Sequence, residues 1–341
     1  MKKSLHVWCA AALFSAAASV SSAAVLGSLY ESDFDTDQTA NWNVNNNGNG
    51  TNAANFFYDY NTLGIPSAPH SAGGTTMGLK LQANISGTGP ASGVLPGISV
   101  SPTGQAFAGD FALRFDWWHN WIGNTSGGIG NSGGGSGSTQ LSTFGVLTSG
   151  TSSNYAGASD SVFYAATGDG ASAQDYRAYS SEAPTSYSTG VVGVNAHNVY
   201  AANNQNNTAT YYTTLFPAGA TVPAAQNAAF PSTQFGTSLA GTAGFRWHDV
   251  FIEKSGNIVT WWVDNKLFAT TDLAAFTGPA PAGTNILFGH ADTSLGAGTP
   301  ASTFQAVDFT LIDNVVVVPE PASLGLLLLS APLLIRRRTR R

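Results

Sequence analysis

Apolar and polar residues alternate with a period of two along much of the chain. In Met77–Ile85 every second residue is apolar. In Asp110–Trp118 four apolar residues share one face, while Arg114, Asp116 and Trp118 point the other way. Such alternation is typical of β-strands that bury one face in a core. We therefore expect a strand in each of these stretches.

Further strands follow towards the C-terminus. Phe245–Lys254 and Ile258–Val263 predict two strands joined by a glycine-containing turn, Ser255-Gly256-Asn257, and Thr303–Val318 predicts a closing strand. Residues 25–318 show no sustained 3.6-residue apolar period, so we expect strands joined by turns, without helices between them. This pattern predicts an all-β fold of two antiparallel sheets packed face to face.

Two segments interrupt the alternation. Residues 123–139 are almost entirely Gly, Ser, Asn and Thr, a composition that favours a flexible loop. Residues 195–231 are rich in Asn, Ala and Pro, and only Tyr211-Tyr212 and Leu215-Phe216 offer strand character. We therefore expect one domain over residues 25–317 with two loop excursions.

Charge is unevenly distributed along the chain. The formal net charge is −6, but residues 25–318 hold six basic residues against 18 acidic ones, and the other basic residues lie near the two ends. A central segment with a net charge of −12 would repel phosphates, so we exclude nucleic acid as a partner. The single cysteine, Cys9, lies in the N-terminal segment, which excludes disulfides, cysteine-ligated zinc and a cysteine nucleophile from the domain.

The N-terminus has the organisation of a secretory signal peptide. Met1-Lys2-Lys3 is a short basic region, an apolar Ala-rich stretch follows, and Ser22-Ala23-Ala24 is a small-x-small pattern. We expect signal peptidase to cleave after Ala24 and the protein to be exported. An uncleaved membrane anchor is the alternative interpretation.

The C-terminus combines a Pro-Glu-Pro motif, an apolar run over residues 322–335 and an arginine cluster at residues 336–341. This tail resembles the PEP-CTERM sorting signal of exported proteins in Gram-negative bacteria that make extracellular polysaccharide, with Pro319, Glu320 and Pro321 matching its motif. The resemblance covers residues 318–341. It implies a transient inner-membrane anchor, recognition by an exosortase, and delivery to the cell surface or extracellular matrix. Retention or cleavage of the anchor stays open.

A second resemblance lies in the predicted hairpin. Trp247-His248-Asp249-Val250, a glycine turn and Trp261-Trp262-Val263-Asp264-Asn265-Lys266-Leu267 resemble a hairpin of concanavalin-like and laminin-G-like jelly rolls. Asn265 stands where that pattern usually has glycine, and asparagine can still adopt a positive φ. The resemblance implies a jelly-roll sandwich, a fold that hosts lectins, glycosidases and adhesion modules.

A glycosidase would need two carboxylates across the scissile bond, about 5–5.5 Å apart for retention or 6.5–9.5 Å for inversion. The Glu-x-Asp-x-x-Glu pattern of such enzymes on this fold is absent. Asp249 and Glu253 share one face of a regular strand, but an ordinary solvated strand end beside a turn is the simpler interpretation. We therefore expect a protein that is not an enzyme.

Two sets of residues are candidates for binding. Asp33, Asp35 and Asp37 alternate along the chain and could supply oxygen ligands to calcium, although an exposed acidic edge is the simpler interpretation. Five histidines of the domain show no short paired spacing, so zinc is not expected. Trp118, Asn120 and Trp121 could stack on and hydrogen-bond a sugar, or could pack in the interior.

Three hypotheses follow from these observations. We favour an exported, exosortase-sorted, non-catalytic lectin-like protein that associates with extracellular polysaccharide at the cell surface or in the matrix. A structural or adhesive matrix protein without a specific ligand is the second. The third is a glycoside hydrolase or lyase, which would lose its activity when Glu253 is replaced by Gln.

Overall fold

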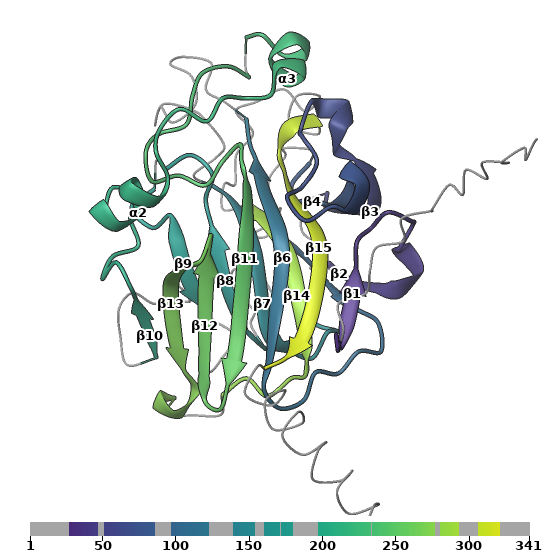
Figure 1. Cartoon of the computed structure of the whole chain (residues 1–341), viewed down its shortest axis with the longest axis vertical. Coiled ribbons are helices and arrows are strands. Elements are labelled where there is room, and N and C mark those ends of the chain that lie inside the picture. Colours follow the sequence, from purple (N-terminus) through teal and green to yellow (C-terminus); the bar gives the residue numbers. More distant parts are fainter. Residues whose placement is uncertain are drawn as a thin grey trace, which may run out of the picture.

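Two antiparallel sheets face each other in this protein (Figure 1). The structure is a computed structural model and describes residues 27–46, 51–85, 97–122, 139–153, 160–170, 172–179, 197–232, 234–276, 280–292 and 306–320. The nine-stranded sheet has the order β10 (Asn198–Tyr200), β13 (Lys266–Asp272), β12 (Ile258–Val263), β11 (Trp247–Ser255), β6 (Phe111–Asn120), β15 (Phe309–Pro319), β4 (Met77–Gln82) and β3 (Ala53–Asp59), with β1 (Tyr30–Ser32) also paired to β15. The six-stranded sheet has the order β2 (Trp42–Asn46), β5 (Gly97–Pro102), β14 (Asn285–Asp292), β7 (Gln140–Thr148), β8 (Val162–Ala166) and β9 (Tyr176–Tyr179). This arrangement confirms the predicted two-sheet jelly-roll sandwich.

The core lies between the two sheets, and the alternation in β6 shows how it is built. Phe115 and Trp117 point inward and are fully buried, together with Leu113. Arg114 lies on the opposite, outer face, where it pairs with Asp249 of the neighbouring strand β11. The faces predicted for this strand are therefore confirmed.

The predicted hairpin is also confirmed. β11 pairs with β12, and Glu253 stands opposite Thr260 in the antiparallel register. Between β12 and β13 the chain reverses through Asp264 (φ 49°) and Asn265 (φ 61°). Two successive positive φ values define the tight turn that matches the twist of paired strands, and asparagine adopts them at low cost. Asn265 thus takes the place that glycine has in similar hairpins.

The expectation of strand character at Tyr211-Tyr212 and at Leu215 was wrong. Tyr211, Tyr212 and Leu215 belong to helix α2 (Thr210–Leu215), and a second short helix, α3, spans Ala224–Ala229. Tyr212 and Phe216, four residues apart, pack against Phe268 in the core. A single apolar pair at helical spacing is too short to show as a period, which is why the helix was missed.

Several predicted features lie outside the described residues: the signal peptide with Ala24, most of the loop at 123–139, Pro321 and the tail beyond it. Within the described ranges, no helix has the length and apolar character required to cross a bilayer.

A second apolar layer covers part of the outer face of the nine-stranded sheet. Trp118 and Trp121 pack there with Tyr60, Ile65 and Phe245, which come from two segments that cross over the sheet. In Figure 1 these segments lie at the top, around α3 and the turn after β3. Elsewhere on this outer face, two hollows adjoin Arg114.

Candidate ligand-binding groove

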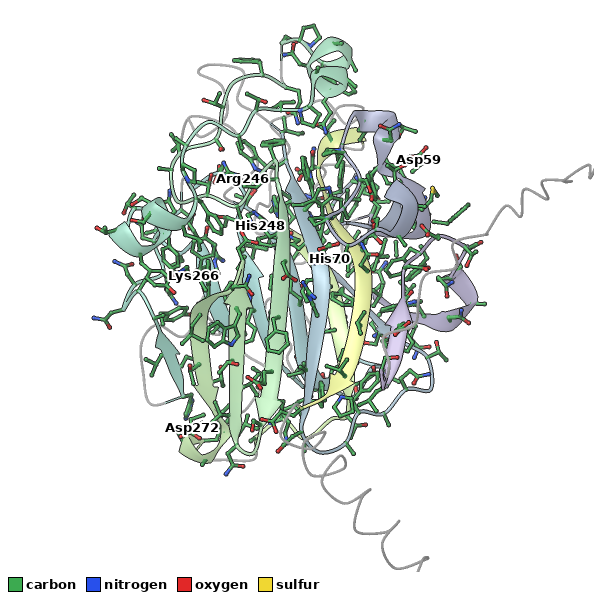
Figure 2. All side chains as sticks on the ribbon, in the orientation of Figure 1. Asp59, His70, Arg246, His248, Lys266 and Asp272 are labelled. Atoms are coloured by element: carbon green, nitrogen blue, oxygen red, sulfur yellow. The ribbon has the colours of Figure 1, made fainter. Side chains whose placement is uncertain are left out.

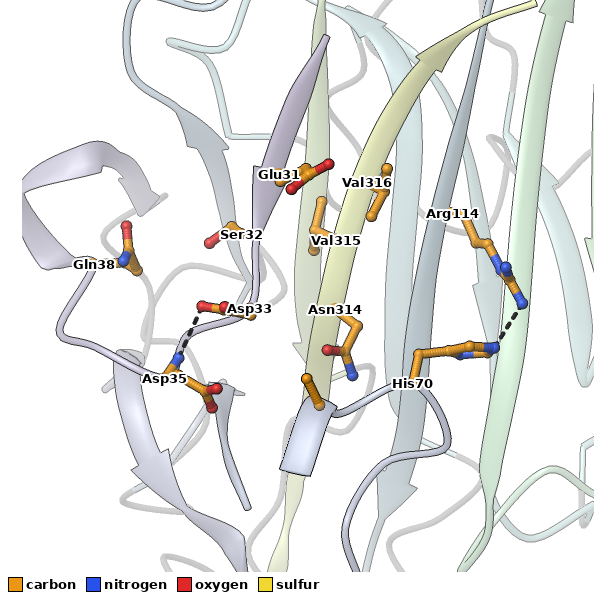
Figure 3. Close-up of a pocket in the computed structure, with 11 residues that line it drawn as sticks. Glu31, Ser32, Asp33, Asp35, Gln38, His70, Arg114, Asn314, Val315 and Val316 are labelled. Carbon is orange, nitrogen blue, oxygen red and sulfur yellow. Dashed lines mark hydrogen bonds between the residues drawn. The ribbon is translucent and has the colours of Figure 1, made fainter. Parts of the chain in front are cut away.

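Two adjoining hollows on the outer face of the nine-stranded sheet share Arg114 and form one groove. Each has a volume of about 440 Å³. The first hollow lies between β1, the segment that follows it, and β15 (Figure 3). The second lies over β11 and β12, where Phe251 and Trp262 line it together with Asn265. Hollows of about 300–1,000 Å³ are the usual size of small-molecule sites.

A β-bulge in the last strand shapes the floor of the groove. Asp313 pairs with Asp116, but Val316 pairs with Arg114, so β15 has one residue more than β6 over this interval. The extra residue is accommodated at Asn314, which has a φ of 52°. The bulge places both Asp313 and Asn314 on the outer face, whereas a regular strand would send one of them into the core.

Asp116 and Asp313 are buried side by side beneath the groove. Asp116 accepts hydrogen bonds from the Nδ1 (2.6 Å) and backbone N–H (3.0 Å) of His70 and from the Nδ2 of Asn314 (2.8 Å). Asp313 accepts from the hydroxyls of Tyr60 and Ser71, both at 3.0 Å. Burial, with a contribution from the Asp116 charge, raises the pKa of Asp313 to about 8. At neutral pH Asp313 is therefore mostly protonated.

His70 lies over the middle of the nine-stranded sheet (Figure 2), and Arg114 links it to β11. With Nδ1–H donated to Asp116, the His70 Nε2 is left as an acceptor and lies 2.6 Å from Arg114 Nη2 (Figure 3). The same guanidinium binds both carboxylate oxygens of Asp249, at 2.7 and 2.8 Å. These hydrogen bonds raise the pKa of Arg114, because they stabilise its charged form. A continuous chain, Asp116–His70–Arg114–Asp249, thus separates the two hollows.

His70, Asp116 and Asp249 also form a group whose ligand atoms lie within 4.8 Å of one another, close enough to hold a metal ion. The Arg114 guanidinium already contacts two of these three side chains and supplies the positive charge between them. A metal ion would have to displace it. The donor set therefore fits a cation, and in this structure that cation is Arg114.

The three predicted calcium ligands do not converge. Asp33 and Asp35 line the first hollow, but Asp37 is exposed and accepts hydrogen bonds from the backbone N–H (2.9 Å) and hydroxyl (2.6 Å) of Thr39. Phe34 has a φ of 54°, so the segment is not a regular strand and its aspartates do not share one face. Calcium binding stays a prediction, with only Asp33 and Asp35 facing one hollow.

Trp118, Asn120 and Trp121 lie in the covered upper part of the sheet, and none of them is more than 3% exposed. Trp118 Nε1 donates to Asn120 Oδ1 (3.2 Å), and Asn120 exchanges two hydrogen bonds with the amide of Gln226. Their surfaces are occupied by protein neighbours, so a sugar would have to displace them. The structure thus places these residues in the packing role that the sequence left open.

Asp249 and Glu253 do share one face, as the spacing predicted, and both line the second hollow. Phe251 lies on the same face between them. Residues four apart on a regular strand are separated by about 13 Å, beyond the 6.5–9.5 Å that an inverting glycosidase needs between its carboxyl groups. Burial, followed by the charge of Glu320, raises the pKa of Glu253.

His70 is one of the groove residues that sequence reasoning missed. It lies on a turn 46 residues before Asp116, and no motif links the two. The available signal was Asp116 itself, a carboxylate in the middle of a largely apolar strand on the face opposite the core. Such a group needs a partner from another segment.

No family model and no curated protein matches this chain. Solved structures with a similar chain course include a protein of unknown function with a galectin-like fold from Bacillus subtilis (7% identity, 86% of this chain and 96% of that one, TM-score 0.36). The carbohydrate recognition domain of Emp47p is also similar, with 11% identity over 85% of this chain and 94% of that one and a TM-score of 0.37. A β-glucanase from Bacillus licheniformis has 12% identity over 86% of this chain and 99% of that one, with a TM-score of 0.37. At these scores the likeness does not bear on what this chain binds.

Proposed function

We propose that the groove around Arg114 binds a saccharide and that the protein associates with extracellular polysaccharide through it. The observation that carries this proposal is the second hollow, where the partly exposed rings of Trp262 and Phe251 lie beside Arg114 and Asp249. Aromatic faces pack on the apolar face of a pyranose ring, while charged and amide groups hydrogen-bond its hydroxyls. Apolar surface and polar groups meet here on one accessible floor.

The groove is also organised before any ligand arrives. The buried Asp116 fixes His70, and the bidentate contact with Asp249 fixes Arg114. A side chain that is already held in place loses little conformational freedom on binding, which favours affinity. This preorganisation supports ligand binding rather than a purely adhesive surface.

We propose further that the protein is exported, sorted by an exosortase and displayed at the surface or in the matrix. Support comes from the position of Pro319 and Glu320 at the end of the last described strand. Pro319 is the last residue of β15 and pairs with Phe111, and the Glu320 N–H donates to Asp110 O at 3.3 Å. The first two residues of the proposed sorting motif therefore lie at the end of the last strand that the structure describes. Detection of the protein on intact cells, with loss of display after Glu320→Ala, would test this proposal.

Replacing Trp262 by Ala is expected to weaken saccharide binding about 5- to 30-fold, because a stacked ring contributes on the order of 1–2 kcal/mol. Kd values from calorimetry on a panel of oligosaccharides would measure the effect. Phe57→Ala is the matched control: Phe57 is an aromatic residue on β3 that is 45% exposed and does not line the groove. Equal Kd values for the wild type and Trp262→Ala would contradict the proposal, and the absence of any saccharide binding would favour an adhesive protein without a ligand.

A further inference from the structure

Negative charge predominates in the groove. Asp33 and Asp35 line the first hollow, and Asp249 and Glu253 line the second. Among the described residues that line the two hollows, Arg114 carries the permanent positive charge, and two of its three nitrogen atoms already donate to Asp249. A ligand that enters the first hollow therefore meets carboxylates whose charge is not balanced there.

Two oxygen atoms at the first hollow have no hydrogen-bond partner among the described residues. One is Asp35 Oδ1, and the other is the hydroxyl of Ser32, a residue that is only 6% exposed. Figure 3 shows both side chains beside Asp33. A buried acceptor without a donor costs free energy, and a ligand that brings N–H groups would recover it.

The closeness of Asp33 and Asp35 points to the same kind of ligand. Burial and the like charge of Asp33 raise its pKa, whereas a hydrogen bond with Thr75 lowers it. Repulsion between two carboxylates falls when a cation lies between them. The first hollow is thus complementary to a group that is both positively charged and rich in hydrogen-bond donors.

We propose that the saccharide bound in the groove carries protonated amines, as in a polymer with free amino sugars, and that Asp33 and Asp35 receive one of these ammonium groups in the first hollow. This inference rests on the proposed function and adds the class of ligand. The second hollow then holds a sugar ring against Trp262, and Arg114 lies between the two positions. A uronic acid polymer would bring further negative charge to the same carboxylates, so the groove disfavours it.

The test compares three oligosaccharides of equal length on the full chain at pH 6: oligomers of glucosamine, of N-acetylglucosamine and of galacturonate. We expect the glucosamine oligomer to bind at least tenfold more tightly than its acetylated counterpart, and the galacturonate oligomer to bind most weakly. Added salt should reduce the preference for the amine, because it screens charge pairs. The decisive variant is the double substitution Asp33→Asn with Asp35→Asn, which keeps side-chain shape and removes both charges.

In the double variant the preference for glucosamine should fall to within about twofold, while the Kd of the acetylated oligomer stays unchanged. Asp37→Asn removes one charge from the same segment but from a side chain that does not line the hollow, and should leave the preference intact. If the preference survives the double substitution, it arises from the net charge of the domain and the inference is overturned. Equal or tighter binding of the acetylated or acidic oligomer overturns it too.

A failure of the proposed function gives results that differ from a failure of the amine preference. If Trp262→Ala leaves the binding of all three oligomers unchanged, the groove is not the saccharide site. If Trp262→Ala weakens both the amine and the acetylated oligomer but the double variant changes neither, the groove binds saccharide without selecting for an amine.

Discussion

Trp261→Ala is expected to lower the free energy of unfolding by about 3–5 kcal/mol, the usual cost of removing a large aromatic side chain from a packed core. Trp261 is fully buried at the centre of the sandwich. The centroid of its ring lies 5.0 Å from the ring centroids of Tyr164 and Phe268 and 5.7 Å from the ring centroid of Phe144. These neighbours come from both sheets, so a cavity here removes contacts between the two layers. Urea unfolding, followed by circular dichroism, would measure the loss.

The adjacent residue provides the control. Trp262 has the same chemistry but points to the outer face, where its ring is partly exposed and its Nε1 donates to Thr260 Oγ1 at 2.9 Å. Trp262→Ala should therefore cost about 1 kcal/mol or less of stability while it weakens saccharide binding. An equal loss of stability in the two variants would contradict the assignment of their faces.

Acid is expected to destabilise the wild type more than a His290→Gln variant. His290 is fully buried at one end of the core; its Nε2–H donates to Gln140 (2.6 Å) and its Nδ1 accepts from the Thr310 hydroxyl (2.8 Å). Burial lowers its pKa to about 3. The unfolded chain, whose histidine has an ordinary pKa near 6.5, therefore binds one more proton than the folded chain between about pH 6.5 and pH 3.

The folded state therefore loses stability as the pH falls below 6.5, and the loss is complete once the pH is below the pKa of His290 in the folded protein. The wild type should lose about 1.4 kcal/mol per pH unit relative to the variant, on the order of 4 kcal/mol by pH 3. Asp313, with its pKa raised to about 8, changes stability in the opposite direction, but equally in both proteins. Urea midpoints from pH 7 to pH 3 would measure the difference, with His197→Gln as a variant that removes a partly exposed imidazole. Parallel pH profiles of the wild type and His290→Gln would contradict the prediction.

The strands and their faces could be predicted because alternation is a local property. Leu113, Phe115 and Trp117 face the core as the pattern in β6 required, and Asp264-Asn265 forms its turn because both residues tolerate a positive φ. Trp118 followed the same rule and does lie on the outer face. Its burial there depends on Tyr60 and Phe245, which belong to segments distant in the sequence. The local pattern around Trp118 does not indicate that these segments cover it.

The groove was harder to predict for a related reason. His70, Arg114 and Asp249 come from three separate parts of the chain, and each is an ordinary polar residue in its own neighbourhood. The bulge at Asn314 adds one residue to a strand whose sequence gives no sign of where the extra residue lies. Assembly of this kind follows from sheet register, which is set by pairing across the whole fold rather than by spacing along it.

The register of β15 also has a mechanical consequence. This strand lies between β6 and β4, contributes Asn314, Val315 and Val316 to the groove, and has Pro319 as its last residue. If the C-terminal end is pulled while a ligand holds the groove, the force acts along only a few residues of β15. The load would be shared in shear by the hydrogen bonds that hold β15 to β6, instead of opening them one after another. A domain held by this end and by a ligand in its groove would carry that tension along the C-terminal part of β15.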